Sequence, residues 1–209
     1  MLSPNMLKTF QTCQKKYYLK YVKNITIPQK LSHFEKGKKI HALANYYLRG
    51  DDITKFEQTL NNEEKTIWNL LKNNEYFQKT YVNSEYNISC KVGNYWLTGR
   101  LDAIVKDEKN YYILDYKTGA IPKNPEYDFQ TIVYLLAFNK MGFNNNLYFV
   151  YIDLKNNKNH IIEYKNEKEY EDKIIKICND IEKYEPKENF EQLKICDLCE
   201  YKKICHLIQ

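Results

Sequence analysis

The sequence predicts an α/β domain, in which helical stretches surround two pairs of strands. Segments 96–105 and 110–118 are rich in β-branched and aromatic residues and flank the polar run 106–109, which is the pattern of a hairpin. A second strand pair is predicted at 147–154 and 159–164, across a turn rich in Asn and Lys. Most of the remaining chain has the apolar spacing or the capping residues of helices.

Length and composition are those of a globular protein. The chain has 209 residues, of which 43% are hydrophobic, so we expect one domain spanning 1–209 with a substantial core. The net charge of +5 is compatible with a polyanionic partner. The 20 Tyr and 9 Phe can stack on unpaired bases, although an AT-biased genome would also raise the Tyr count.

No segment resembles a membrane span or a signal peptide. The longest apolar runs fall well short of the roughly eighteen residues that a span needs. We therefore expect a cytoplasmic protein without membrane attachment. In a reducing compartment its six cysteines are expected to be thiols or metal ligands rather than disulfides.

Two helices are predicted near the N-terminus. Ser3 can cap a helix over 3–22, and Pro4 suits its first position. Its apolar residues recur at helical spacing: Leu7, Phe10, Tyr17 and Tyr21. Cys13 lies inside this helix. A second helix is predicted from 34 to 48, ended by Gly50.

The next segments lead into the hairpin. One or two polar helices are expected over 51–73, followed by a strand at 81–91 that turns through Gly93-Asn94. Glu85 on this strand is either a third carboxylate near a metal or a solvated strand residue. We prefer the solvated interpretation and leave Glu85 outside the predicted site.

Two further helices follow the hairpin. The first is expected from 127 to 141, after a loop with Pro122 and Pro125. The second is expected from 166 to 184, ending before Pro186.

The hairpin carries the candidate catalytic residues. Asp115 and Lys117 share one face of the second strand, and Asp102 lies on the first. Burying such charges is costly unless a cation and an anionic ligand complete the site. Two carboxylates can hold a hard divalent cation for phosphodiester hydrolysis, with Lys117 stabilising the developing charge. The alternative is a cross-strand ion pair between Asp102 and Lys117 on a solvated face.

These motifs resemble a known family. Gly99-Arg-Leu-Asp102 and Asp115-Tyr-Lys-Thr-Gly119, with the two acids thirteen positions apart, resemble the core of the PD-(D/E)XK nucleases, specifically their RecB-like branch. Leu101 stands where the family often has Pro. The resemblance implies a restriction-endonuclease-like central mixed sheet flanked by helices.

The resemblance also assigns roles to residues outside the hairpin. His41 taken alone is more often a hydrogen-bonded helix residue, but in Gly37-x-x-x-His41 it resembles the family's metal ligand. Gln130 and Tyr134, four apart on one helix face, resemble the QxxxY motif. In that motif Gln130 would orient a catalytic water or phosphate, and Tyr134 would contact the DNA strand. The implied metal ligands are His41, Asp102, Asp115 and the carbonyl of Tyr116.

A second signal lies at the C-terminus. Cys196, Cys199 and Cys205 form a C-x2-C-x5-C pattern that lacks one ligand, for which Cys13 is the natural candidate. The four resemble the [4Fe-4S] ligands of AddB-type nucleases and of CRISPR-associated exonucleases that process spacer DNA. A structural zinc site is the alternative, with the same thiolates or with His206 replacing one. Cys90 and Cys178 fall outside the pattern and are expected to be small buried hydrophobes.

The resemblance implies a Mg²⁺- or Mn²⁺-dependent exonuclease acting on single-stranded DNA, in repair, recombination or CRISPR spacer processing. The alternative is a catalytically silent DNA-binding or adaptor subunit of a helicase–nuclease or integration complex. A zinc-stapled nucleic-acid module is a third reading. The sequence has no P-loop, so any unwinding would come from a partner such as a helicase.

Overall fold

The computed structural model describes residues 1–28, 32–143, 146–186 and 194–205. Its centre is a five-stranded sheet in the order β1-β2-β3-β4-β5. The strands are β1 (Thr80–Val92), β2 (Tyr95–Lys106), β3 (Asn110–Lys117), β4 (Asn146–Asp153) and β5 (Lys158–Glu163). The sheet is mixed, because β3 and β4 are parallel whereas the other neighbours are antiparallel. This arrangement confirms the predicted α/β fold with a central mixed sheet.

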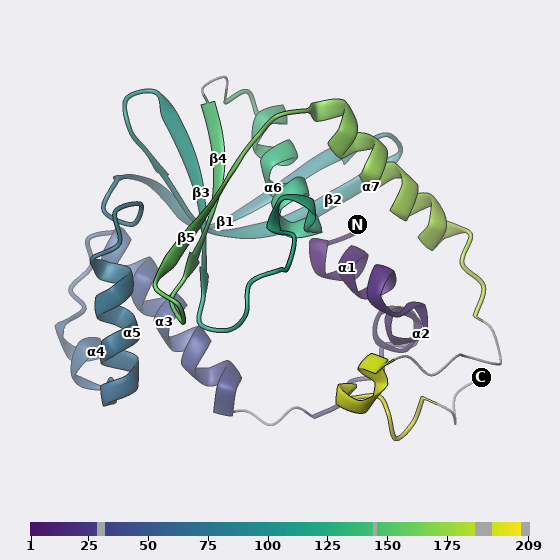
Figure 1. Cartoon of the computed structure of the whole chain (residues 1–209), viewed down its shortest axis with the longest axis horizontal. Coiled ribbons are helices and arrows are strands. Elements are labelled where there is room, and N and C mark those ends of the chain that lie inside the picture. Colours follow the sequence, from purple (N-terminus) through teal and green to yellow (C-terminus); the bar gives the residue numbers. More distant parts are fainter. Residues whose placement is uncertain (29–31, 144–145, 187–193, 206–209) are drawn as a thin grey trace.

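Helices cover both faces of the sheet (Figure 1). The helices are α1 (Pro4–Thr12), α2 (Gln14–Tyr17), α3 (Ser32–Leu48), α4 (Thr54–Gln58), α5 (Asn62–Lys72), α6 (Phe129–Lys140) and α7 (Glu167–Glu182), with a π-helical turn at Tyr18–Val22 and 3₁₀ turns at Pro125–Tyr127 and Lys194–Leu198. One core lies between the sheet and α1, α6 and α7. The other lies between the sheet and α3 and α5. None of the helices in the described part of the chain is long and apolar enough to cross a membrane.

The site is positioned by the crossover from β3 through α6 to β4. Parallel strands need such a connection, and here it is a helix whose residues 131–138 are all buried. Asp128 caps this helix, because its side chain accepts a hydrogen bond from the backbone N–H of Gln130. The first turn of α6 is thereby fixed beside the end of β3.

In β1 and β2 the alternation of side chains between the two faces of the sheet is broken near Glu85 and Asp102. Ser84 pairs with Ala103 and Tyr86 with Leu101, so Glu85 and Asp102 lie between these pairs. Leu101 packs in the core with α6, whereas Ala103, two residues later, packs in the core with α3. A regular strand would place both on one face. Glu85 has a left-handed backbone here, with φ of 50°, and the register of the two strands also shifts shortly before it, between Tyr81 and Asn83.

The N-terminal prediction of one continuous helix over 3–22 is wrong. Ser3 caps α1 as expected, but the helix ends at Thr12, and Cys13 adopts an extended backbone with φ −160°. The Cys13 Sγ then accepts a hydrogen bond from the N–H of Lys16, which starts a second helix. The apolar spacing could not show this break, because buried apolar residues continue on both sides of it. They are Leu7 and Phe10 in α1, Tyr17 in α2 and Leu19 in the π-helical turn.

The other predicted elements agree with the structure to within a few residues at their ends. The region 51–73 forms two helices, and a capping box joins Asn61 and Glu64 at the start of α5. Cys90 and Cys178 are buried, with exposed fractions of 6% and 1%, as expected.

Gly99 allows β2 to approach α6 closely. A Cβ at this position would lie 2.3 Å from Cε1 of Tyr134, so Gly99→Ala must displace the ring. We expect Gly99→Ala to lower the free energy of unfolding by about 1–3 kcal/mol through overpacking. Gly119→Ala is the matched control, because a Cβ there meets no atom within 4 Å. Equal denaturation midpoints for the two variants would contradict this packing.

Candidate active site

Asp115 and Lys117 come from the end of β3 and lie on the α6 side of the sheet. Asp115 is buried, with 3% of the residue exposed. The Nζ of Lys117 lies 3.1 Å from Oδ1 and 2.8 Å from Oδ2 of Asp115. Gln130 on α6 donates from Nε2 to the Asp115 Oδ1 at 2.5 Å, and its Oε1 accepts from Lys117 at 3.4 Å. The amide therefore bridges the carboxylate and the ammonium group.

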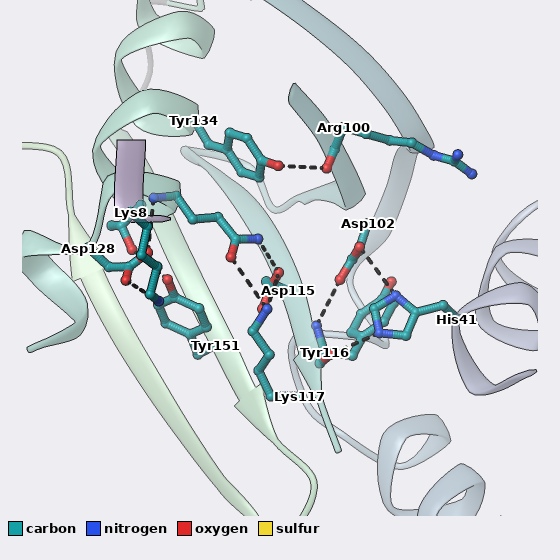
Figure 2. A network of polar contacts seen from close by, with 12 residues as sticks. Lys8, His41, Arg100, Asp102, Asp115, Tyr116, Lys117, Asp128, Tyr134 and Tyr151 are labelled. Atoms are coloured by element: carbon teal, nitrogen blue, oxygen red, sulfur yellow. Dashed lines mark hydrogen bonds and ion pairs between the residues drawn. The ribbon is translucent and has the colours of Figure 1, made fainter. Parts of the chain in front are cut away.

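His41 and Asp102 meet beside the same strand (Figure 2). The Nδ1 of His41 lies 3.3 Å from an Asp102 oxygen, and its Nε2 lies 3.0 Å from the carbonyl oxygen of Tyr116. The other Asp102 oxygen accepts a hydrogen bond from the N–H of Tyr116 at 3.1 Å. The structure thus brings together three of the four predicted groups: His41, Asp102 and the Tyr116 carbonyl. Asp115, the fourth, contacts Lys117 and Gln130 instead.

Glu85 also reaches this site, which the sequence analysis did not predict. One ligand atom from each of His41, Glu85 and Asp102 lies within 4.8 Å of the other two. Glu85 is only 22% exposed at its side chain, and it forms an ion pair with Arg100. The metal-side placement was the alternative that the sequence analysis did not prefer, since regular alternation along β1 cannot reveal a left-handed residue.

The charges of the site shift the pKa values of its members. Burial raises the pKa of Asp115, and the negative charge of Asp102 adds to this, while Lys117 opposes it. Burial alone would lower the pKa of His41, but the hydrogen bond and charge of Asp102 raise it to about 9. Burial would likewise lower the pKa of Lys117, yet Asp115 raises it. The site therefore favours the charged forms of His41 and Lys117, whereas the net shift of Asp115 is toward its neutral form.

The residues present can hold a divalent cation. Carboxylate oxygens are the preferred ligands of Mg²⁺ and Mn²⁺, and one imidazole nitrogen is compatible with such a site. His41, Glu85 and Asp102 already place three donor atoms within the span of one ion. Asp115 is not among these three in the described part of the chain, although the charges of Asp102 and His41 act on its pKa.

Tyr134 and Asp128 fix the surroundings of these groups. The Tyr134 hydroxyl donates to the carbonyl oxygen of Arg100 at 3.0 Å, and the residue is 7% exposed. Asp128 accepts a 2.6 Å hydrogen bond from Lys8, which ties α1 to the start of α6 (Figure 2). In this arrangement Tyr134 holds β2 against α6. Its expected contact with a DNA strand stays a prediction.

The cysteines of the C-terminal pattern gather near Cys13. Cys13, Cys196 and Cys205 line a pocket of about 590 Å³. Burial raises the pKa of the Cys205 thiol, and the neighbouring thiols of Cys13, Cys199 and Cys196 raise it further. The two ends of the chain meet here through Lys16 and Glu200, at 2.8 Å, and through a Tyr201 hydroxyl that donates to the Ile25 carbonyl. His206, the alternative zinc ligand, lies outside the described residues.

The site combines acidic side chains, a lysine and a bridging amide at the end of a strand in a mixed sheet. The family model of the PD-(D/E)XK nuclease superfamily matches residues 1–206. The chain therefore belongs to this superfamily of phosphodiester hydrolases, which use divalent metals. A comparison with curated proteins gives no match.

One solved structure supports the fold, and a second is similar to a lesser degree. A crystal structure from Eubacterium rectale, whose description suggests an exonuclease, superposes with a TM-score of 0.58 at 12% identity, over 94% of this chain and 91% of that one. The crystal structure of SSO0001 gives a TM-score of 0.48 at 17% identity, over 98% of this chain and 84% of that one. At these identities the likeness concerns the fold alone.

The left-handed backbone of Glu85 predicts a stability effect. A residue with a Cβ loses about 1–2 kcal/mol in this conformation, whereas glycine does not. We expect Glu85→Gly to be more stable than Glu85→Gln by about 1 kcal/mol, or roughly 2–4 °C in Tm. Asn87→Gly, at an exposed residue of the same strand, is the control and should lower Tm. A Glu85→Gly variant no more stable than Glu85→Gln would show that the backbone is not strained.

Proposed function

We propose that this protein is a Mg²⁺- or Mn²⁺-dependent deoxyribonuclease of the RecB-like branch that degrades single-stranded DNA from an end. The observation that carries the proposal is the contact between buried Asp115, Lys117 and Gln130, together with the bonds of His41 and Asp102 to the backbone of the adjoining residue, Tyr116. A structural ion pair needs neither the bridging amide nor a second acidic group next to it. The set is what a site for a metal and a phosphate requires.

Each residue has a distinct role in this proposal. His41, Asp102, Asp115 and the Tyr116 carbonyl hold the metal, which supplies an activated water and neutralises charge on the scissile phosphate. Lys117 stabilises the charge that develops on the phosphate. Gln130 holds the side chains of Asp115 and Lys117 in position through its two hydrogen bonds, and it orients the water or the phosphate.

The preference for single-stranded ends has its own support. The printed description of the Eubacterium rectale structure suggests an exonuclease, and the sequence motifs resemble enzymes that digest single strands. The basic net charge of +5 is compatible with a nucleic-acid substrate. Repair, recombination and CRISPR spacer processing are the pathways in which such an activity would serve, with a helicase or integration proteins as partners.

The proposal predicts metal-dependent shortening of end-labelled single-stranded DNA. Asp115→Asn keeps the side-chain shape but removes the charge, so we expect cleavage to fall by at least about a hundredfold. Asp172→Asn is the matched control, because Asp172 is an exposed acid on α7. Cleavage should also stop with EDTA. Cutting by Asp115→Asn at the wild-type rate would refute the site, and binding without any cutting by the wild type would favour the silent adaptor subunit.

We further propose that Cys13, Cys196, Cys199 and Cys205 bind a [4Fe-4S] cluster that joins the two ends of the chain. The support for this proposal is the C-x2-C-x5-C pattern of the sequence, together with the position of Cys13, Cys196 and Cys205 around one pocket.

Cys199→Ala should lose most of the bound iron and the visible absorption of the cluster after anaerobic purification. It should also lower Tm, because the contacts between the chain ends would loosen. Cys90→Ala is the matched control and should keep its iron, since Cys90 is buried between β1 and α6. Stoichiometric zinc in the wild type, or unchanged iron in Cys199→Ala, would refute the cluster.

A further inference from the structure

The charges of the active site form three pairs. Each carboxylate contacts one basic side chain: Asp115 with Lys117, Asp102 with His41, and Glu85 with Arg100. The basic partners differ in exposure, because the side chain of Arg100 is 63% exposed while those of Lys117 and His41 are 29% and 28% exposed. Arg100 is therefore the cation that can leave its partner most readily.

Glu85 is placed for ligand binding at a conformational cost. Its left-handed backbone lies inside a strand, where an extended residue would pair without strain. The same conformation sets its carboxylate opposite Asp102, with a ligand atom of each within 4.8 Å of His41. Strain of this kind persists where the surrounding structure imposes it, most often at functional sites.

An orphaned hydroxyl nearby is a second sign of an incomplete site. The Tyr116 hydroxyl is buried and has no hydrogen-bond partner among the described residues. The Tyr116 ring packs against that of His41, one of the three candidate ligands. A buried hydroxyl without a partner is an exception in proteins, and it is expected where a ligand or its water completes a site.

Arg100 has the chemistry of a phosphate-binding residue. Its backbone carbonyl is fixed by Tyr134, while its side chain extends in the opposite direction (Figure 2). A guanidinium presents a planar fork of donors that matches a phosphate as well as it matches a carboxylate. Its exposure leaves those donors accessible to the backbone of a nucleic acid.

We propose that Glu85 is a further metal ligand of this site. In this proposal the Arg100 guanidinium pairs with the Glu85 carboxylate until it binds a backbone phosphate of the nucleic acid instead. This inference rests on the proposed function. Substrate binding would then free a carboxylate for the cation, so metal and nucleic acid would bind cooperatively. The coupling is reciprocal, because each ligand favours the same released state of Arg100.

Calorimetric titration with Mn²⁺ in the absence of DNA tests the competition. Arg100→Gln should raise Mn²⁺ affinity roughly two- to fivefold, as expected for loss of a partly exposed ion pair. Glu85→Gln should lower it by at least about tenfold, comparable to losing a supporting partner of a metal. In the double variant the gain from Arg100→Gln should vanish, since its target carboxylate is gone. Glu167→Gln, which alters a surface pair with Lys140, is the matched control.

A second titration includes a nuclease-resistant phosphorothioate single strand. The strand should strengthen Mn²⁺ binding to the wild type more than to Arg100→Gln. Equal coupling in both proteins, or unchanged Mn²⁺ affinity in Glu85→Gln, would overturn the inference. Asp102→Asn distinguishes a failure of the proposed function from a failure of this inference. If this variant binds Mn²⁺ like the wild type, the proposed metal site itself fails. If it loses Mn²⁺ while Glu85→Gln does not, only the role of Glu85 fails.

Discussion

The burial of Asp115 is the constraint on which the rest of the site depends. A carboxylate with 3% exposure would be neutral unless its surroundings compensated its charge. Lys117 and Gln130 supply that compensation from β3 and α6. The crossover helix α6 therefore stabilises the charge of Asp115 in addition to packing on the sheet. A cation entering the site would compensate the same charge from the opposite side.

The hairpin and its chemistry could be predicted from sequence because they follow simple periodicities. Alternation along β3 placed Asp115 and Lys117 on one face, and the structure has them there. Four-residue spacing put Gln130 and Tyr134 on the same side of α6, where both face the hairpin. The side-chain directions of these residues follow from the regular geometry of a strand or a helix, so the spacing in the sequence was sufficient to predict them.

Two features could not be predicted, because each breaks a periodicity through a single residue. The left-handed backbone of Glu85 turns the residues on either side of it to different faces and brings an acid to the site. The extended backbone of Cys13 interrupts a helix whose apolar spacing continues. In both cases the side chain concerned has a candidate ligand role. Such departures from local preference are expected where function competes with regular structure.

The meeting of the chain ends has a consequence for how the molecule assembles. Lys16 and Glu200 are separated by 184 residues, whereas β1, β2 and β3 pair with their neighbours in sequence. Contacts of long sequence separation form late, because the intervening chain must first be ordered. During synthesis the sheet can fold while the cysteine-bearing tail is still inside the ribosome. The segment around Glu200 can then pack against the segment around Lys16, which is synthesised earlier.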